Sequence, residues 1–364
     1  MTCYYLIVLL IFVFGIWSVD NNASRGNVCF VLLIMSFFLT IIAGTRTIGY
    51  DYETYEQYFI NTKPFFQHFE RRDMSFEIGY EYLMRGIKTL SGNFHVFLTL
   101  FTGLSMGTMC ALYLKWSPYP LLSLMLYCSY ALFAMVMGQM RQPFAINLAY
   151  LLFIPLLLKH RIWAASILTI IVGILFHKSL LMAAPFIIFA TTTLTKKKIV
   201  IISIAAGICY LFSAALLPII KSIVPPGFYY AHTIIAYLTY LTKSLSFSLG
   251  MIERVAICLV LFHFAYKHQL YRHDALLRIM INLYFFGAVI YFSFIGMSTE
   301  FAARGTHAFN FAMFMALPIL MKKLKGQDKW IVFGIIILLS LYHFSDFLIS
   351  PMLYNPYKSI LSSI

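Results

Sequence analysis

Four short polar clusters interrupt a chain that is otherwise almost continuously apolar. They lie at residues 49–55, 140–143, 176–179 and 300–304, and each contains at least one ionisable side chain. Ionisable groups are costly to keep in apolar surroundings, so several of them at one face of a membrane would indicate a shared polar cavity. These residue types favour a membrane enzyme that acts on an anionic substrate.

Arg141 is the strongest candidate for binding a phosphate group. It stands between two apolar runs, next to Gln142 and Pro143. A guanidinium pairs bidentately with phosphate, and Pro143 suits the first turn of a helix, whose free backbone N–H groups also attract anions. The alternative is an arginine that reaches the lipid headgroups. We favour substrate binding because short loops on the same predicted side hold few other cations.

His177 and Lys178 break a long apolar stretch in two. His177 could act as a general base or contact a diphosphate, and Lys178 could supply a point charge to a phosphate. A lone histidine at a helix end can also be a polar tip without a role. No second histidine lies at metal-ligand spacing from His177, so we predict neither a metal site nor another cofactor.

Carboxylates and tyrosines follow Arg46 at the start of a long polar segment. Asp51 could deprotonate an attacking sugar hydroxyl, and Tyr55 could stack on a sugar or hydrogen-bond it. Glu77, further along the segment, is a second carboxylate candidate. Each acid could instead belong to a solvated loop, so the sequence leaves both interpretations open.

Glu300 and Arg304 lie in the turn between two predicted spans. The two side chains could form an ion pair with each other. Arg304 could instead be a second clamp for a diphosphate, and the sequence favours neither alternative.

The composition places these clusters in a membrane protein. Of 364 residues, 61% are hydrophobic and 11% are charged, and the mean hydropathy is +0.83. Soluble domains carry about 25% charged residues. Successive apolar runs are long enough to cross a bilayer, which predicts an all-α integral membrane protein, a single polytopic domain over residues 1–364 with about 12 transmembrane helices. The predicted spans are residues 3–19, 27–44, 94–114, 119–138, 143–158, 162–176, 179–193, 199–220, 249–266, 275–297, 306–321 and 330–347.

The loops on the two sides of the membrane differ in charge. The odd-numbered loops hold 13 Lys and Arg against three acids, whereas the other side holds 12 against nine. Short basic loops face the cytoplasm, which places the four polar clusters and both termini on the outer face. The net charge of +14 is therefore explained by membrane orientation. We predict the lipid bilayer and no nucleic acid as a partner, because the sequence holds no basic soluble module.

Two predicted outer segments, residues 45–93 and 221–248, exceed the length of a turn. In the first, an apolar and a charged stripe repeat with helical spacing, which predicts an amphipathic helix on the outer membrane surface. The stripes are Phe76, Tyr80, Leu83 and Ile87, and Glu77, Glu81, Arg85 and Lys88. The second holds a Pro-Pro-Gly turn at residues 225–227 that is followed directly by Phe228, Tyr229 and Tyr230, whose rings suit sugar faces and lipid headgroups equally.

The motifs around these residues resemble those of the EpsG family of bacterial exopolysaccharide proteins, which is related in role to Wzy-type O-antigen and capsule polymerases. The resemblance covers roughly residues 40–320, and Arg141-Gln142 and His177 with Ser179 are its most specific parts. The motifs are Gly49-Tyr50-Asp51-Tyr52 with Tyr55, Phe76-Glu77-Ile78-Gly79-Tyr80, Met140-Arg141-Gln142-Pro143-Phe144-Ala145 and Phe176-His177-Lys178-Ser179.

The resemblance implies a metal-independent integral-membrane glycosyltransferase, multi-pass in the inner (cytoplasmic) membrane of a bacterial cell, with its active site facing the periplasm or exterior. Its substrates would be oligosaccharide repeat units linked to undecaprenyl diphosphate, and a chain-length regulator protein is a further implied partner. A hydroxyl of the next lipid-linked unit would attack the anomeric carbon of the growing chain. Undecaprenyl diphosphate would then leave.

Within that reaction the polar residues take distinct roles. Arg141, supported by Lys178 and Arg304, would stabilise the charge that grows on the leaving diphosphate. Asp51 is the preferred general base, and His177 is the alternative base or a second diphosphate contact. The remaining residues predicted to bind substrate are Gln142, Tyr55, Glu77 and Arg46.

Three other functions compete with a polymerase. An O-antigen ligase usually carries a large outer loop late in the chain, whereas the longest one here comes early, at residues 45–93. A transporter or flippase of lipid-linked oligosaccharide should show internal repeats and charges at mid-membrane. We find no repeat, and the predicted spans are nearly free of mid-span charge, since Glu253, Arg254 and Arg278 lie near span ends. An acetyltransferase would need catalytic groups on the cytoplasmic side.

Overall fold

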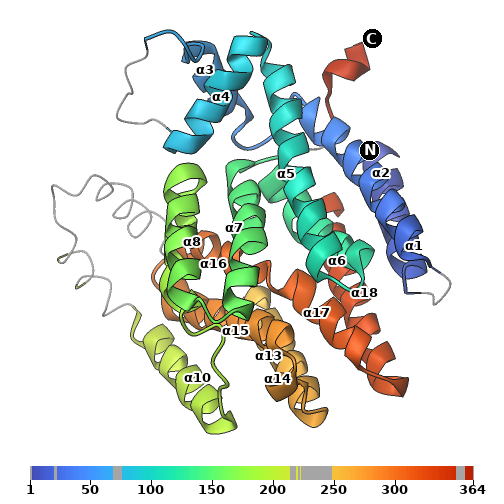
Figure 1. Ribbon diagram of the computed structural model, residues 1–364, viewed down its shortest axis with the longest axis vertical. Helices are drawn as coiled ribbons and strands as arrows, with labels where there is room; N and C mark the ends of the chain where they lie inside the picture. The colour runs from blue at the N-terminus through green and yellow to red at the C-terminus, as the bar shows by residue number, and fades with distance from the viewer. Residues whose placement is uncertain are drawn as a thin grey trace. The chain divides into compact units, whose positions relative to one another are not determined.

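The computed structural model describes residues 2–19, 23–68, 76–213, 248–349 and 357–363, together with Ile219 and Ser222. The described residues form helices and one isolated antiparallel bridge, between Arg46 and Ser359, and no strand (Figure 1). The all-α prediction is therefore confirmed for this part of the chain. The Pro-Pro-Gly turn and aromatic residues of the predicted segment 221–248 lie outside the described residues.

Nine of the predicted spans coincide with apolar helical elements. A tenth, residues 199–220, coincides with α10 (Lys196–Leu211) over its first part, and its residues 214–218 and 220 lie outside the described residues. Among the described residues, six helices are long and apolar enough to cross a membrane: α2 (Arg25–Gly44), α5 (Phe94–Trp116), α7 (Arg141–Leu158), α13 (Leu249–Lys267), α15 (Ala275–Ile295) and α18 (Gly326–Ile349). Shorter apolar elements are α1 (Thr2–Trp17), α6 (Pro120–Tyr127) with the π-helix Cys128–Val136 that continues it, and α8 (Ile162–Phe176). The remaining described α-helices are α3 (Tyr52–Asn61), α4 (Ile78–Leu90), α9 (Ala184–Ile187), α10 (Lys196–Leu211), α14 (Leu270–His273), α16 (Thr299–Asn310) and α17 (Met313–Lys323), and Lys178–Met182 and Ile360–Ser363 form 3₁₀ helices.

Two predicted spans differ from the structure. Residues 179–193 form a short 3₁₀ helix, Lys178–Met182, followed by the four-residue α9 instead of one continuous helix. Pro185 lies in the first turn of α9, and it would break a longer helix because it lacks a backbone N–H. Residues 306–321 are divided between the end of α16 and α17.

Short polar side chains begin many of these helices. Each accepts a hydrogen bond from a backbone N–H of the first turn, which satisfies a donor that the helix itself leaves unpaired. The capping residues are Ser24 for α2, Asn93 for α5, Thr195 for α10, Ser248 for α13, Asp274 for α15 and Ser298 for α16. The helix starts are therefore encoded locally in the sequence.

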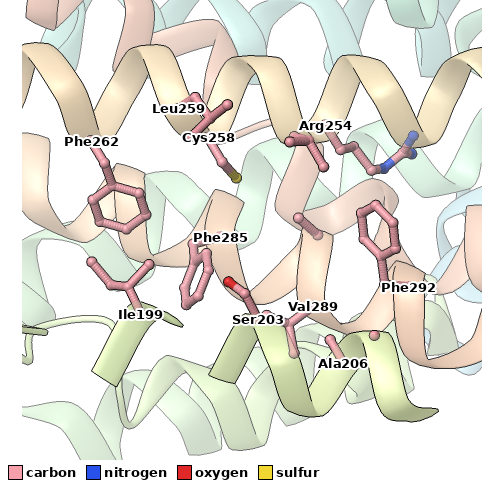
Figure 2. A pocket seen from close by; sticks show the side chains of 13 residues that line it. Ile199, Ser203, Ala206, Arg254, Cys258, Leu259, Phe262, Phe285, Val289 and Phe292 are labelled. Atoms are coloured by element: carbon pink, nitrogen blue, oxygen red, sulfur yellow. The ribbon is translucent and has the colours of Figure 1, made fainter. Parts of the chain in front are cut away.

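The chain divides into two compact units. Unit 1 consists of Met1–Pro155, Ile167–Lys178 and Leu317–Ile364, and unit 2 of Leu156–Ser166 and Ser179–Ala316. In unit 1, α2 packs along α5, α1 along α6, and α18 against the π-helix. In unit 2, α15 contacts α10, α13, α14 and α16, and a largely apolar cavity lies between α10, α13 and α15 (Figure 2). The single domain over residues 1–364 stays a prediction.

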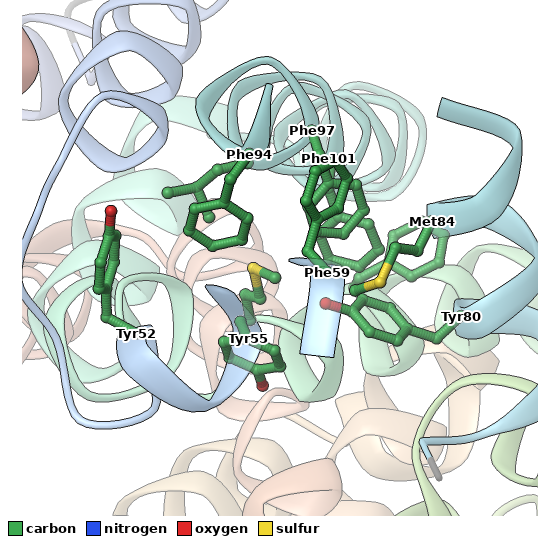
Figure 3. Packing of buried hydrophobic residues seen from close by; sticks show 11 residues of the cluster. Tyr52, Tyr55, Phe59, Tyr80, Met84, Phe94, Phe97 and Phe101 are labelled. Atoms are coloured by element: carbon green, nitrogen blue, oxygen red, sulfur yellow. The ribbon is translucent and has the colours of Figure 1, made fainter. Parts of the chain in front are cut away.

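In unit 1 an aromatic cluster attaches α3 and α4 to α5. Tyr55 and Phe59 of α3, Tyr80 of α4, and Phe97 and Phe101 of α5 are all fully buried in it (Figure 3). Phe59 stacks on Phe97 with 5.4 Å between ring centroids, a geometry that favours aromatic pairs. The cluster fixes the two short helices of the predicted outer segment 45–93.

The amphipathic helix expected in this segment is confirmed as α4, but its charged stripe is not solvated. Glu81 is fully buried and Arg85 is 7% exposed. Glu81 accepts a hydrogen bond of 2.7 Å from the hydroxyl of Tyr58. Arg85 donates to the carbonyl oxygens of residues 63, 64, 65 and 67. Both sides of α4 therefore contribute to packing, which the helical stripes alone do not reveal.

Candidate functional site

A buried ion pair joins the first residue of α7 to the residue that precedes α4. Nη1 of Arg141 contacts Oε2 of Glu77, and the two side chains are 16% and 7% exposed. The backbone N–H of Lys178 donates to Oε1 of Glu77 at 3.4 Å. Glu77 occupies the N-cap position of α4 without making a capping hydrogen bond. Its carboxylate is therefore directed to Arg141 and Lys178 rather than to its own helix.

Three aromatic rings surround the guanidinium of Arg141. Its Cζ lies 4.2 Å from the ring centroid of Phe76, 5.6 Å from that of Tyr80 and 5.8 Å from that of Tyr55. Nε of Arg141 donates to the Tyr55 hydroxyl at 3.4 Å. Cations are attracted to the faces of aromatic rings, most strongly where water is excluded. The guanidinium is thus oriented before any substrate binds.

Burial keeps the tyrosine hydroxyls of this site protonated. It raises the pKa of Tyr55, an effect that Arg141 partly offsets and that Asp51 and Glu77 add to. Burial also raises the pKa of Tyr80 well above its usual value. Both side chains are therefore neutral phenols near neutral pH, able to make hydrogen bonds without adding negative charge.

Asp51 and Arg46 lie close enough to the tyrosines of this site for their charges to act on them. Asp51 is half-buried and is the N-cap residue of α3, but its side chain makes no capping hydrogen bond. Its charge acts on Tyr55, and the charge of Arg46 acts on Tyr80. Gly49, two residues before Asp51, has a φ of 146°, which side-chain-bearing residues rarely adopt. This glycine lets the chain turn sharply into α3.

The C-terminal segment 357–363 forms backbone hydrogen bonds with the loop that carries Arg46. The sequence did not predict this contact. The N–H of Thr47 donates to the carbonyl of Lys358 at 3.0 Å, and the N–H of Ile360 donates to the carbonyl of Thr45 at 3.0 Å. Arg46 itself is fully buried and donates through Nη1 to the carbonyl of Ala43. No motif in the sequence indicates this long-range pairing.

The end of α8 brings His177 and Lys178 beside α4. Gly79 of α4 lies so close to this end that an added Cβ would be 2.8 Å from the carbonyl oxygen of Leu175. Only glycine permits such an approach of two backbones. His177 lies between α8 and the 3₁₀ helix that begins at Lys178, and it is directly followed by the N–H that binds Glu77.

The remaining predicted site residue in unit 1 is Gln142. It is fully buried beside Arg141 in the first turn of α7, and its N–H donates to the carbonyl of Gln139 at 2.9 Å. The structure thus gathers residues from three of the four sequence clusters, together with Arg46 and Glu77, in unit 1.

The comparison with known proteins agrees with these motifs. The EpsG family model matches residues 28–359, nearly the whole chain. The chain belongs to the EpsG family. No curated protein and no solved structure gives a significant match. EpsG is a family of Wzy-type polymerases, so membership supports a surface-polysaccharide polymerase-like, glycosyltransferase-like role. Together with the apolar helices, it supports a multi-pass membrane protein.

The fourth cluster of this EpsG-family chain lies in unit 2. Nε of Arg304 donates to Oε2 of Glu300 at 3.0 Å, one turn apart in α16, and the two side chains are 44% and 43% exposed. The ion-pair alternative is therefore confirmed. A role for Arg304 as a diphosphate clamp stays a prediction.

The groups around Arg141 offer cations, carboxylates and neutral phenols. Such a set can bind an anionic group and accept a proton from a hydroxyl. Within the described part of the chain, no group of three His, Cys, Asp or Glu side chains is placed to hold a metal ion. The absence of metals and other cofactors stays a prediction, as do the individual roles of the site residues.

Proposed function

We propose that this EpsG-family protein polymerises a bacterial surface polysaccharide on the outer face of the inner membrane. Its substrates are oligosaccharide repeat units carried on undecaprenyl diphosphate. A hydroxyl oxygen of the next lipid-linked unit attacks the anomeric carbon of the growing chain, and the bond from that carbon to the diphosphate oxygen breaks. The electron pair leaves with the diphosphate, and the hydroxyl proton passes to a base. Attack opposite the leaving group inverts the anomeric centre.

The buried Arg141 carries this proposal. Glu77 accepts a hydrogen bond from Nη1 and Tyr55 accepts one from Nε. In the described part of the chain, the hydrogens of Nη2 and the second hydrogen of Nη1 are left to reach a diphosphate oxygen. A preorganised cation stabilises the charge that develops on a leaving group, and it does so most strongly where water is excluded. Glu77 acts as a positioning residue, since its ion pair with Arg141 orients the guanidinium and Glu77 itself does not contact the substrate.

Asp51 is the general base in this proposal. Glu77 is paired with Arg141, and proton uptake would cost it that pair. Asp51 is half-buried and makes no capping bond, which leaves its carboxylate available to an acceptor hydroxyl. His177 is the alternative base, and Lys178 and Arg46 add positive charge on the diphosphate side.

The test is the polymer made in cells that carry single variants at normal protein levels. Arg141→Lys keeps the charge but loses the planar fork, and we expect at least about a hundredfold loss of long polymer with accumulation of single units. Asp51→Asn should also abolish polymerisation. The matched control is Arg272→Lys, at an exposed position in α14, which should leave polymer length unchanged.

Two results would contradict the proposal. Unchanged polymer length and yield in both Arg141→Lys and Asp51→Asn would remove the mechanism. Full-length polymer that accumulates without attachment after deletion of the gene would instead indicate a ligase.

A further inference from the structure

Unit 2 contains a cavity of about 400 Å³ between α10, α13 and α15. The size falls within the usual range of small-molecule sites. Side chains of Phe262, Phe285 and Phe292 line it (Figure 2). Val255 and Leu259 also line it, and they are 45% and 65% exposed, so the cavity is accessible from the surface of this unit. In a membrane, such an apolar surface faces hydrocarbon chains.

Arg254 stands at one end of this cavity, and Ile199 and Phe262 stand at the other (Figure 2). The Cζ of Arg254 lies 3.7 Å from the ring centroid of Tyr291, and Nη1 donates to the carbonyl of Gly250 at 2.9 Å. Its Nε is buried and has no hydrogen-bond partner among the described residues. The described residues that line the cavity include no carboxylate. A cation at the end of an apolar cavity whose own lining supplies no carboxylate favours an anionic ligand in that cavity.

A long apolar cavity that ends at one arginine matches a lipid with one hydrocarbon chain and one anionic head. From Arg254 to Phe262 the cavity follows α13 for about 12 Å at 1.5 Å per residue, enough for part of such a chain. A bilayer phospholipid carries two chains, for which this single cavity is a poorer match.

Polymerisation requires two diphosphate lipids at once. The donor's diphosphate is attached to the reacting carbon, whereas the acceptor's diphosphate stays at the far end of the repeat unit. The acceptor lipid therefore needs a cation and an apolar surface of its own. The cavity in unit 2 shares no residue with the Arg141 site of unit 1.

We infer that the cavity binds the isoprenoid chain of the acceptor lipid and that Arg254 contacts its diphosphate. This assignment of the acceptor rests on the proposed function. It makes α10, α13 and α15 the part of the protein that holds the acceptor lipid while Arg141 stabilises the leaving group of the donor.

Photo-crosslinking of the full-length protein in lipid nanodiscs tests the binding. The probe is a polyprenyl diphosphate with a diazirine in its chain, and labelled peptides are mapped by mass spectrometry. We expect labels on α10, α13 and α15. An added Cβ at Gly207, which lines the cavity, meets no atom within 4 Å. We therefore expect the side chain of Gly207→Leu to occupy part of the cavity and reduce this labelling about tenfold.

The control variants distinguish binding of the lipid's hydrocarbon chain from binding of its diphosphate head group. Gly334→Leu adds the same side chain at an equally open position in α18 and should not change the labelling. Arg254→Gln should weaken labelling by the diphosphate probe about tenfold and leave labelling by the corresponding polyprenol unchanged. Unchanged labelling in Gly207→Leu would overturn the inference. Displacement of the probe by phosphatidylglycerol as readily as by polyprenyl diphosphate would also overturn it.

A transfer assay links the cavity to the acceptor. The acceptor probe is a lipid-linked unit in which CH₂ replaces the oxygen between the anomeric carbon and phosphorus, so it cannot act as a donor. Gly207→Leu should raise the concentration of this acceptor needed for half-maximal transfer about tenfold without changing that of the donor. Polymer that is lost only in Arg141 variants, with normal acceptor use in Gly207→Leu, would defeat this inference alone. Normal polymer in cells without the protein would defeat the proposed function and, with it, the acceptor assignment.

Discussion

Arg141 and Arg304 each pair with a glutamate, but the two pairs differ in burial and in the distance they bridge along the chain. Arg141 and Glu77 are 64 residues apart and are 16% and 7% exposed, whereas Arg304 and Glu300 are four residues apart and are 44% and 43% exposed. The first pair joins two helices, and the second lies on one helix. The same two residue types thus serve two different physical purposes.

The difference in burial determines how much each ion pair contributes to the free energy of unfolding. An exposed pair one helical turn apart contributes about 0.3–0.5 kcal/mol, because water and salt screen it. In a buried pair, loss of one partner costs about 3–5 kcal/mol, since a charge is then left without compensation. The Arg141 pair should therefore affect both stability and activity, and the Arg304 pair should affect neither strongly.

The largest expected effect comes from removing one carboxylate of each pair. Glu77→Gln leaves Arg141 without its counter-charge, and we expect about 3 kcal/mol less free energy of unfolding and loss of polymer. Glu300→Gln should cost less than about 1 kcal/mol and keep polymer length. Unfolding of the purified protein in detergent and polysaccharide gels of complemented cells measure both quantities.

The proposed difference between the two ion pairs is wrong if Glu77→Gln and Glu300→Gln have the same effect on stability and polymer length. Glu77→Asp serves as a milder variant that keeps the charge and shortens the side chain. If it folds normally but makes only short polymer, the position of Arg141 is the property that matters. Equal losses of stability in Glu77→Gln and Glu300→Gln would show that burial does not distinguish the pairs.

A double-mutant cycle on each pair is the second prediction. The cycle combines Arg141→Gln with Glu77→Gln, and Arg304→Gln with Glu300→Gln, and compares free energies of unfolding. We expect a coupling energy of at least about 1.5 kcal/mol for the buried pair and no more than about 0.5 kcal/mol for the exposed one. A coupling near zero for Arg141 and Glu77 would indicate that the aromatic rings alone hold the guanidinium.

The sequence predicted the helical class and nine of the spans, because hydrophobic runs are local signals. The role that its motifs give to Arg141 stays a prediction. The sequence also predicted an ion pair between Glu300 and Arg304 as one of two alternatives, since residues four apart face each other on a helix. It could not show that Glu77 pairs with Arg141, because packing of α4 onto α5 and α8 brings them together. The sequence also could not show the hydrogen bonds between residues 357–363 and the loop that carries Arg46, because these bonds join segments that lie far apart in the chain.

The third prediction concerns the hydroxyl that accepts a hydrogen bond from Arg141. Tyr55→Phe keeps the ring in the aromatic cluster but removes the acceptor of Nε. We expect a loss of about 1 kcal/mol in free energy of unfolding and a several-fold loss of polymer. The control is Tyr5→Phe, because Tyr5 is 51% exposed in α1. A Tyr55→Phe protein with full stability and activity would limit the role of Tyr55 to packing.

The smallest expected effect is the dependence of each pair on salt. The Debye length falls from roughly 30 Å at 0.01 M to about 3 Å at 1 M ionic strength, and exposed pairs are screened far more than buried ones. The coupling energy of Arg304 and Glu300 should therefore fall towards zero across this range, a change of a few tenths of a kcal/mol. That of Arg141 and Glu77 should stay within experimental error, because protein rather than solvent surrounds it. Repeating both double-mutant cycles at the two salt concentrations measures the difference. A buried pair that weakened as much as the exposed one would mean that water reaches Arg141, which would also weaken its proposed action on the leaving group.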